Sequence, residues 1–301
     1  MTRGFPARLV LLVMALVLVV GGCRVGASDS PALGEVRGMY LGEQPPGLVP
    51  QLFAPAVFRD EIHSVPVFSL DGHEVYWRPM NGSRIQYMRQ VEGLWTPPAT
   101  PGFAATNDDS PAFSPDGQRI FFISWRAGGE DIWCVHRTDG GWSSPEALPQ
   151  VVNSLIIHWQ ISVASNGDLY FGGKPTEDSD QDIYRAVLVD GEYRAVEKLG
   201  SPVSMSGSYE HSPYIAPDGS YLIFSRTDSR LTNSDLYVCF RNSAGSWGPA
   251  LRFDSPINTA WHDQCASVSL DGRYLFFLSF RGGKSQIYWV DAAVIEAMRP
   301  I

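Results

Sequence analysis

The sequence predicts an all-β fold, and three of its features indicate this class. Short apolar segments alternate with turns rich in Gly, Pro, Asp and Asn along most of the chain. Charged residues make up only 18% of the 301 residues and aromatic residues 12%, a composition that does not favour long helices. A turn with Asp-Gly or Asn-Gly recurs five times. Together these features favour a repeated assembly of small antiparallel sheets.

The repeat is centred on a polar turn between two apolar segments. Asp-Gly and Asn-Gly between apolar runs are strong signals for a hairpin, because Gly and Asn tolerate positive φ. The Asp or Asn residues of successive turns are 45, 50, 52 and 53 residues apart. The five turns are Ser69–Gly72, Ser114–Gly117, Ser165–Gly167, Ala216–Gly219 and Ser269–Gly272.

Two further strands complete each unit. After the hairpin and a polar loop comes a third apolar segment, such as Asp131-Ile132-Trp133. A second turn with an aromatic residue follows in most repeats, for example Gly141-Trp142, and then a last short segment. Four antiparallel strands per repeat is the architecture of a propeller blade. The sequence therefore predicts a five-bladed β-propeller of four-stranded antiparallel blades.

The two ends of the chain are expected to close the ring of blades. The fifth repeat stops after residues 287–291 and a short helix-like tail over 292–298, so it has no fourth strand of its own. Residues 50–57 form a surplus strand before the first repeat, similar to the segment 252–257 that ends the fourth repeat. We expect this N-terminal strand to complete the last blade, because pairing removes an open sheet edge.

The repeat resembles that of a known family. The Ser-Pro-Asp-Gly turn, then an aliphatic and aromatic strand, then Asp-Ile-Trp or Asp-Ile-Tyr, is similar to the TolB-like β-propeller repeat. The clearest copy is 111–136, and the resemblance covers roughly residues 50–291. Such repeats occur in periplasmic binding proteins, in accessory domains of peptidases and in many lipoproteins. The resemblance therefore implies the fold and leaves the function open.

The N-terminal residues predict an exported bacterial lipoprotein. Arg3 and Arg8 precede an apolar run over 9–20, which is shorter than the roughly 20 residues of a membrane span. The run ends in Val20-Gly21-Gly22-Cys23, which resembles a lipobox; an ordinary signal peptide with a coincidental cysteine is the alternative. A lipid on Cys23 would anchor the protein at the outer membrane, on its periplasmic face or at the cell surface. The expected organisation is a signal peptide over 1–22, lipidated Cys23 with a flexible tether over 23–36, and the propeller over 37–301.

Composition also limits the partners. The net charge of −9 disfavours a nucleic-acid partner, because no basic face is evident. Cys134, Cys239 and Cys265 show no metal-ligand or disulfide spacing, and we expect buried free thiols without a cofactor. Each blade places at least one Arg or Lys in or beside the loop between its second and third strands. We expect a solvated rim of mixed charge there, with an anionic ligand as the alternative.

The aligned repeats define two rings of candidate site residues. Ligands of propellers usually bind on the face formed by the loops that enter the innermost strands and the loops that join strands two and three. Eight residues before each turn Asp or Asn, every blade has an ionisable residue. This first ring is His63, Asp108, His158, Glu210 and Asp263. The next position gives the second ring, Ser64, Asp109, Trp159, His211 and Gln264.

These residues allow four interpretations. The plainest is a solvated rim around the channel. A mouth that binds a small ligand or a sugar is the second, and a metal ion held by His63, His158 and Glu210 is the third. The fourth is a glycoside hydrolase, by analogy, with Asp108, Glu210 and Asp263 as its acids. The expected ligand-binding set at the channel mouth is His63, Asp108, Asp109, His158, Trp159, Glu210, His211 and Asp263.

The favoured function is binding without catalysis. The sequence has no nucleophile elbow, no zinc-protease motif and no phosphate loop. We expect a lipoprotein that presents one propeller face to a protein, peptide or glycan in the cell envelope, with the lipid as its sole membrane contact. A glycan-active hydrolase and a purely structural envelope assembly factor are the alternatives.

Overall fold

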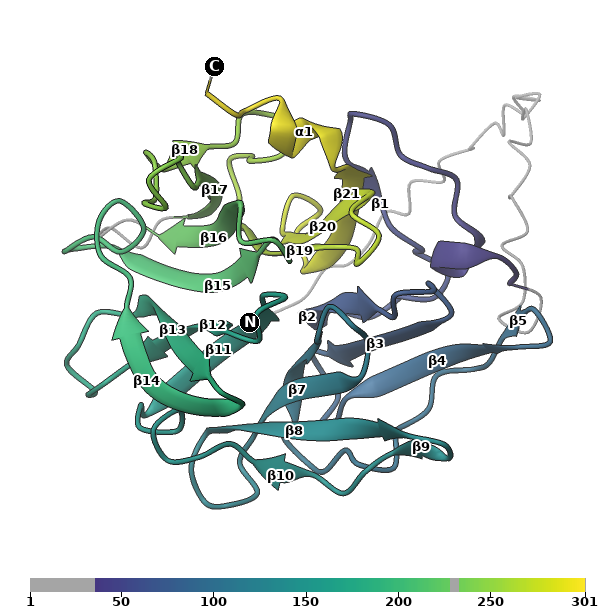
Figure 1. The fold of residues 1–301 in the computed structure, drawn as a ribbon. Coiled ribbons are helices and arrows are strands. Elements are labelled where there is room, and N and C mark those ends of the chain that lie inside the picture. The colour runs from purple at the N-terminus through teal and green to yellow at the C-terminus, as the bar shows by residue number, and fades with distance from the viewer. Residues whose placement is uncertain (1–35, 228–232, 301) are drawn as a thin grey trace, which may run out of the picture. The chain divides into compact units, whose positions relative to one another are not determined.

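Five antiparallel sheets form the fold, as the repeat predicts (Figure 1). The computed structural model describes residues 36–227 and 233–300, all within one structural unit, Pro31–Ile301. The predicted signal peptide, Cys23 and the tether up to residue 35 lie outside these residues. In the described part of the chain, no helix combines the length and apolar character that crossing a membrane requires.

Each sheet is one blade, and we number the blades in chain order by their innermost strand. Blade 1 is β2 (Ile62–Phe68), β3 (Glu74–Pro79), β4 (Gln86–Val91) and β5 (Leu94–Trp95). Blade 2 is β6 (Asp109–Phe113), β7 (Arg119–Ser124) and β8 (Asp131–Thr138), with β9 (Gly141–Trp142) and β10 (Glu146–Ala147) sharing the outer edge of β8.

The other three blades have the same order of strands. Blade 3 is β11 (Ile157–Val163), β12 (Leu169–Lys174), β13 (Asp182–Val189) and β14 (Glu192–Lys198). Blade 4 is β15 (Tyr209–Ile215), β16 (Tyr221–Thr227), β17 (Ser234–Phe240) and β18 (Leu251–Arg252). Blade 5 is β19 (Asp263–Val268), β20 (Tyr274–Ser279), β21 (Gln286–Asp291) and β1 (Gln51–Leu52).

The innermost strands form a closed ring. β2 contacts β6, β6 contacts β11, β11 contacts β15, β15 contacts β19, and β19 contacts β2. Every blade therefore covers its apolar faces with two neighbours, as a sheet with two hydrophobic faces requires. The expected five-bladed propeller is confirmed.

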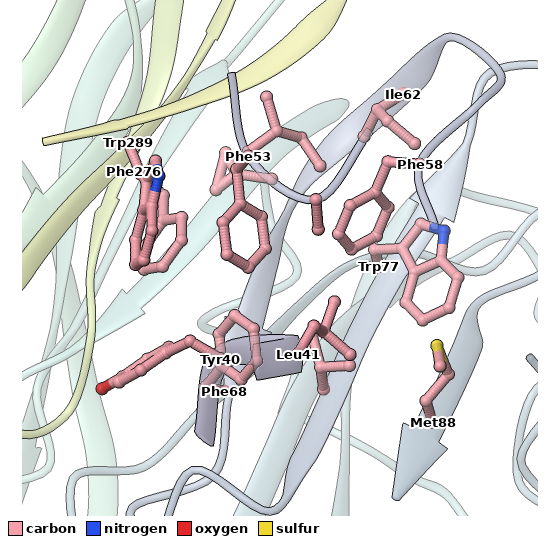
Figure 2. Close-up of a cluster of buried hydrophobic side chains, with 14 of the residues drawn as sticks. Tyr40, Leu41, Phe53, Phe58, Ile62, Phe68, Trp77, Met88, Phe276 and Trp289 are labelled. Carbon is pink, nitrogen blue, oxygen red and sulfur yellow. The ribbon is translucent and has the colours of Figure 1, made fainter. Parts of the chain in front are cut away.

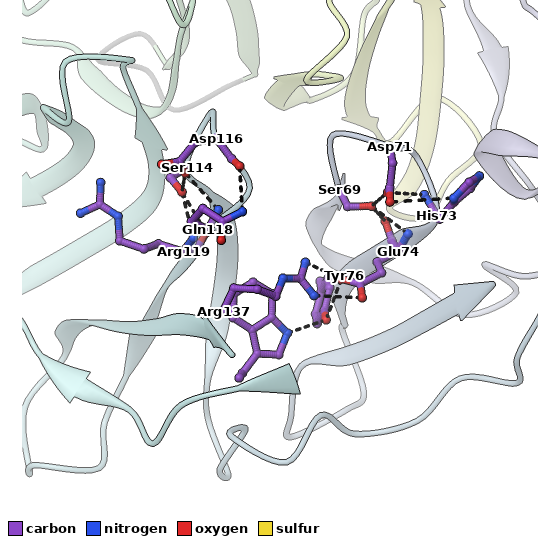
Figure 3. Close-up of polar contacts among 11 residues, drawn as sticks. Ser69, Asp71, His73, Glu74, Tyr76, Ser114, Asp116, Gln118, Arg119 and Arg137 are labelled. Atoms are coloured by element: carbon purple, nitrogen blue, oxygen red, sulfur yellow. Dashed lines mark hydrogen bonds and ion pairs between the residues drawn. The ribbon is translucent and has the colours of Figure 1, made fainter. Parts of the chain in front are cut away.

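The polar turns have the predicted hairpin geometry (Figure 3). Ser69 Oγ donates to Asp71 Oδ1 at 2.6 Å, and the same Oδ1 accepts the His73 N–H at 3.0 Å. Gly72 between them has a φ of 68°, a conformation that side chains with a Cβ rarely adopt. Ser114–Asp116 and Ser269–Asp271 repeat the Ser-to-Asp bond at 2.5 and 2.6 Å. The turn thus satisfies its own polar groups, which explains why it recurs.

The N-terminal strand closes the ring as expected. In blade 5, Gln51 pairs with Trp289 and Leu52 with Tyr288, antiparallel to β21. Phe53 follows and is 1% exposed, with its ring 4.9 Å from Trp289 and 5.0 Å from Phe276. Figure 2 shows these rings packed together beside the side chains of blade 1. Strand β1 therefore closes both the sheet edge and the core between blades 5 and 1.

Two short helical segments flank the ring. The 3₁₀ segment η2 (Met39–Gly42) places the Tyr40 ring 5.0 Å from both Phe68 and Tyr274 (Figure 2). Helix α1 (Ala293–Glu296) lies within the expected helical tail and buries Ile295 against blades 4 and 5.

Candidate functional site

Two cavities lie along the propeller axis. The first, which we name the mouth cavity, has a volume of about 440 Å³ and is lined by all five blades. Its walls come from the starts of the innermost strands and from the loops after the second strands, the face that the sequence predicts for ligands. The second, which we name the inner channel, has only about 50 Å³ and is lined by the middle of the innermost strands.

A repeated β-bulge shapes the floor of the mouth cavity. In every innermost strand the pairing register shifts at the position after the second ring. A bulge leaves one residue unpaired and turns its side chain out of the sheet pattern. In blades 2 to 5 this residue has a positive φ, which is rare for residues other than glycine. The four residues are Ser110 (49°), Gln160 (37°), Ser212 (52°) and Cys265 (56°).

The three carboxylates of the first ring do not face the mouth cavity, which corrects the expectation of one common ring. Asp108, Glu210 and Asp263 are fully buried and are absent from the cavity walls. Each makes an ion pair with an arginine of its own blade, which lies in the second strand or just after it. The pairs are Asp108–Arg126, Glu210–Arg226 at 2.7 Å and Asp263–Arg281 at 2.9 Å.

These ion pairs fasten the entry loops to the blades. Arg281 also donates to the carbonyls of Pro256 and Ile257, and Asp263 accepts the backbone N–H of Thr259 at 2.6 Å. The guanidinium lies over the Tyr288 ring at 4.4 Å. Blades 2 and 4 repeat the arrangement with their own loops and aromatic rings. The arginines expected on a solvated rim are therefore structural partners in three blades.

Histidines replace the carboxylates in blades 1 and 3. His158 is fully buried, and its ring nitrogens lie 2.6 Å from the carbonyl oxygen of Glu130 and 3.3 Å from that of Val152. Burial lowers the pKa of His158, and its hydrogen bonds to the two carbonyl oxygens oppose this shift. The side chain of His63, in contrast, is 45% exposed at the mouth cavity.

A charged cluster joins blades 1 and 2 at the wall of the mouth cavity. Asp109 Oδ2 lies 2.6 Å from His63 Nδ1 and accepts a hydrogen bond of 3.1 Å from Arg78 Nη1. All three residues line the cavity. Arg78 lies on β3 of blade 1. The first-ring residue of this blade is His63, so the blade has no first-ring carboxylate to pair with Arg78. Arg78 therefore contacts the next blade instead.

Glu130 adds a carboxyl group to the same wall. It precedes β8, and its Oε1 accepts the backbone N–H of His158 at 3.0 Å. Burial raises the pKa of Glu130 to about 7, opposed by the His158 hydrogen bond and assisted by the nearby charge of Asp109. The pKa therefore lies in the range where a carboxyl group can donate or accept a proton near neutral pH.

The opposite wall is neutral. The two ring nitrogens of His211 each lie 3.1 Å from a hydroxyl oxygen, one of Ser212 and one of Ser234. Burial lowers the pKa of His211 to about 4, with a smaller contribution from His262, so the ring carries no charge at neutral pH. The indole of Trp159 meets this ring edge to face, with 5.9 Å between the centroids.

Two tryptophans are exposed at the mouth cavity. Trp125, in the loop after β7, is 52% exposed, and Trp159, on β11, is 45% exposed. Both line the cavity, and Phe280 of blade 5 lines it as well. An exposed indole costs hydration free energy, so side chains of this kind are common where a ligand covers them.

The structure does not bring the expected metal ligands together. His63 contacts Asp109, His158 contacts backbone carbonyls, and Glu210 contacts Arg226 and Ser208. Among residues 36–227 and 233–300, no group of three or more His, Cys, Asp or Glu side chains has the arrangement of a metal site. The donor set therefore does not fit a bound metal ion.

Five of the eight expected mouth residues line the cavity, and several others join them. His63, Asp109, His158, Trp159 and His211 are the five. The site also includes Arg78, Trp125, Glu130, Gln160 and Cys265, which the two rings leave out. Extending the ring alignment by one position would have found Gln160 and Cys265, because both follow the second ring directly. The other three lie in or beside loops of variable length, where the repeat gives no register.

Comparison with known proteins identifies the fold. No family model matches the chain, and no curated protein matches it in sequence. TolB from Acinetobacter baumannii is similar in structure, with a TM-score of 0.53, 18% identity, and coverage of 78% of this chain and 52% of that one. The putative TolB from Agrobacterium tumefaciens has a TM-score of 0.54 and 18% identity over 77% of each chain.

An endo-arabinase has the same degree of structural similarity. The enzyme from Bacteroides thetaiotaomicron VPI-5482 has a TM-score of 0.54 and 16% identity, and the match covers 82% of this chain and 97% of the enzyme. The chain spans about half the length of the Acinetobacter TolB. At these identities the similarity concerns the fold. The protein is a β-propeller with a ligand-sized cavity on its axis, and its propeller is TolB-like.

Proposed function

We propose that this protein binds a glycan in the mouth cavity without transforming it. The observation that carries the proposal is the combination of two half-exposed indoles, Trp125 and Trp159, with a wall of hydrogen-bonding side chains in one cavity of about 440 Å³. A sugar ring has an apolar face of C–H groups and an edge of hydroxyl groups. An indole matches the face, and paired charged groups match the edge.

Arg78 provides a specific argument for a polar ligand. Its Nη1 donates to Asp109, but its buried Nε has no hydrogen-bond partner among the described residues. A buried donor without a partner is costly, so the guanidinium is not fully satisfied by the protein. The side chain is 17% exposed and lines the cavity, so its accessible N–H groups can meet a hydroxyl oxygen of the ligand. Because Asp109 and Arg78 compensate each other, the cluster favours a neutral polar group over a strongly charged ligand.

The positions of the three carboxylates expected to act in hydrolysis favour a binding function over a catalytic one. Asp108, Glu210 and Asp263 each pair with an arginine and hold an entry loop, away from the cavity walls. A catalytic acid must reach the bond that it protonates. In this arrangement the three carboxylates do not reach a ligand in the mouth cavity, which supports binding over hydrolysis by these residues.

A glycan array with matched variants tests the proposal. We expect the protein to bind at least one class of oligosaccharide, and Trp159→Ala to weaken this binding by about tenfold or more. Trp261→Ala is the control, because Trp261 is 55% exposed and does not line the mouth cavity. An array without any bound glycan, or equal loss in both variants, would contradict the proposal. Capture of a peptide or protein at this cavity would favour the other binding partners considered.

A glycan-active hydrolase remains the second candidate because of Glu130. Burial raises the pKa of this carboxyl group to about 7, as general acids require. If the protein hydrolyses glycans, Glu130→Gln should abolish release of reducing sugars and leave binding intact. If the unaltered protein releases no sugar from any bound glycan, the hydrolase hypothesis is wrong.

We further propose that the protein acts in the cell envelope as a lipoprotein. The support is the lipobox-like sequence Val20-Gly21-Gly22-Cys23 after a short apolar run. Labelled palmitate should appear in the protein when it is expressed in a bacterial host, and Cys23→Ser should remove the label. Unlabelled protein with intact Cys23 would favour an ordinary signal peptide.

A further inference from the structure

The side chain of Gln160 reaches past the neighbouring blade to the next one. It belongs to blade 3, yet its Nε2 donates a hydrogen bond of 2.8 Å to the backbone carbonyl of Ala266 in blade 5. β11 and β19 are not neighbours in the ring, because β15 of blade 4 lies between them. The amide therefore spans the central space instead of pairing with an adjacent strand.

Its position separates the two axial cavities. Gln160 lines both the mouth cavity and the inner channel, together with Ser64 and Ser110. Above it lies a volume of about 440 Å³, and below it only about 50 Å³. A space of the smaller size admits a few water molecules and no sugar ring. The mouth cavity is thus closed at its inner end.

The ring of bulge residues shows why one blade provides this closure. The residue directly after the second ring is Val65, Ser110, Gln160, Ser212 or Cys265 in blades 1 to 5. Four of these side chains are short, whereas glutamine is long enough to reach across. Gln160 also has a φ of 37°, a strained backbone that the surrounding structure must maintain.

We propose that Gln160 is a specificity-determining residue that closes the mouth cavity, so that the cavity receives the terminal sugar of a glycan and not an internal segment. This inference rests on the proposed function. A ligand that enters a closed cavity end-on must stop at its floor, and its free end contacts the Gln160 amide. A chain that bound through internal sugars would instead lie across the opening.

The first experiment uses the best-binding hexasaccharide from the glycan array. One sample carries a 2-aminobenzamide cap at the reducing end, and a second carries a bulky benzyl cap at the other end. We expect one cap to weaken binding by about tenfold or more, because the floor leaves no room for it, and the other cap to have little effect. If both caps are tolerated, or both abolish binding, end recognition is wrong although glycan binding stands. If no glycan binds, the proposed function and this inference both fail.

The second experiment enlarges the floor. Gln160→Gly removes the amide and suits the positive φ, so the fold should persist, which thermal unfolding verifies. The probes are methyl ethers of the terminal sugar that bind the unaltered protein about tenfold more weakly than the unmethylated glycan. The Gln160→Gly variant should bind these ethers nearly as well as it binds the unmethylated glycan. Gln118→Ala is the control, because Gln118 is exposed just before β7 and lines neither cavity, and it should reject the ethers as the unaltered protein does. If Gln160→Gly rejects the ethers as strongly as the unaltered protein does, Gln160 is not the floor.

Discussion

Arg78 of blade 1 donates a hydrogen bond of 3.1 Å from its Nη1 to Asp109 Oδ2 of blade 2. The same carboxylate oxygen lies 2.6 Å from His63 Nδ1, so Arg78 and His63 both contact it. This contact connects adjacent blades at the wall of the mouth cavity. It orients the guanidinium that we expect to meet the ligand.

Replacing Asp109 should lower the affinity for the ligand and have a smaller effect on the stability of the fold. Asp109→Asn keeps the shape but removes the charge that holds Arg78, and we expect about tenfold lower affinity for the bound glycan, measured by calorimetry. Asp139→Asn is the control, because Asp139 is exposed in the turn after β8 and away from the cavity. Equal affinities for the two variants would show that the cluster does not position a ligand-binding group.

The arginine that holds Asp263 should be important for stability. Arg281→Met leaves a fully buried carboxylate without its cation, and we expect a loss of about 3 kcal/mol in the free energy of unfolding. Arg281→Met combined with Asp263→Asn should recover part of this loss, because no charge remains unpaired. Urea denaturation measures both, with Arg194→Met in the exposed Arg194–Glu192 pair as a control that should cost under about 1 kcal/mol. Similar losses for Arg281→Met and Arg194→Met would disprove the structural role.

Phe53 should be important for ring closure. Phe53→Ala removes a ring that is 1% exposed and packs between blade 5 and blade 1, and we expect a loss of about 3 kcal/mol or more. Val49→Ala, two residues before β1, is the control, since Val49 is 61% exposed. The midpoint of thermal unfolding is the measurement. A Phe53→Ala protein as stable as Val49→Ala would mean that β1 contributes little to closure.

Glu130 should make stability depend on pH. Its pKa is about 7 in the folded protein and about 4.5 for an ordinary glutamate, so the unfolded chain loses this proton first as the pH rises. The free energy of unfolding should therefore fall between about pH 4.5 and pH 7, and the cost is fully present above pH 7. Glu130→Gln should remove this decrease, as urea denaturation at several pH values would show.

The control for that experiment is Glu146→Gln, because Glu146 is exposed on β10. Its stability should follow the same pH dependence as the unaltered protein. If Glu130→Gln and Glu146→Gln have identical pH profiles, the Glu130 carboxyl group titrates normally in the fold.

The repeated turns made the architecture predictable. Each Asp-Gly or Asn-Gly turn satisfies its own polar groups, so local sequence is sufficient to place the hairpins. The surplus segment before the first repeat likewise predicted the pairing of Gln51 with Trp289. The split outer edge of blade 2 was not predicted. Pro145 lies between β9 and β10 and lacks the N–H that a continuous strand would need.

The site was harder to predict because it depends on partners distant in sequence. The ring alignment placed Asp108 and His63 at equivalent positions, but their burial and their contacts differ. Asp108 finds Arg126 18 residues later in its own blade, and the pair is buried. In blade 1 the arginine of the second strand, Arg78, contacts Asp109 of blade 2, and His63 remains exposed beside the same carboxylate. Only the spatial arrangement of loops and second strands distinguishes these cases.

Closure of the ring has a consequence for how the chain folds. Strand β1 precedes its partner β21 in the chain by four whole blades and two further strands. Until β20 and β21 are synthesised, Phe53 has neither Phe276 nor Trp289 to cover it. The native ring can therefore form only after β21 has been translated, and until then the apolar side chain of Phe53 is without its native partners in blade 5.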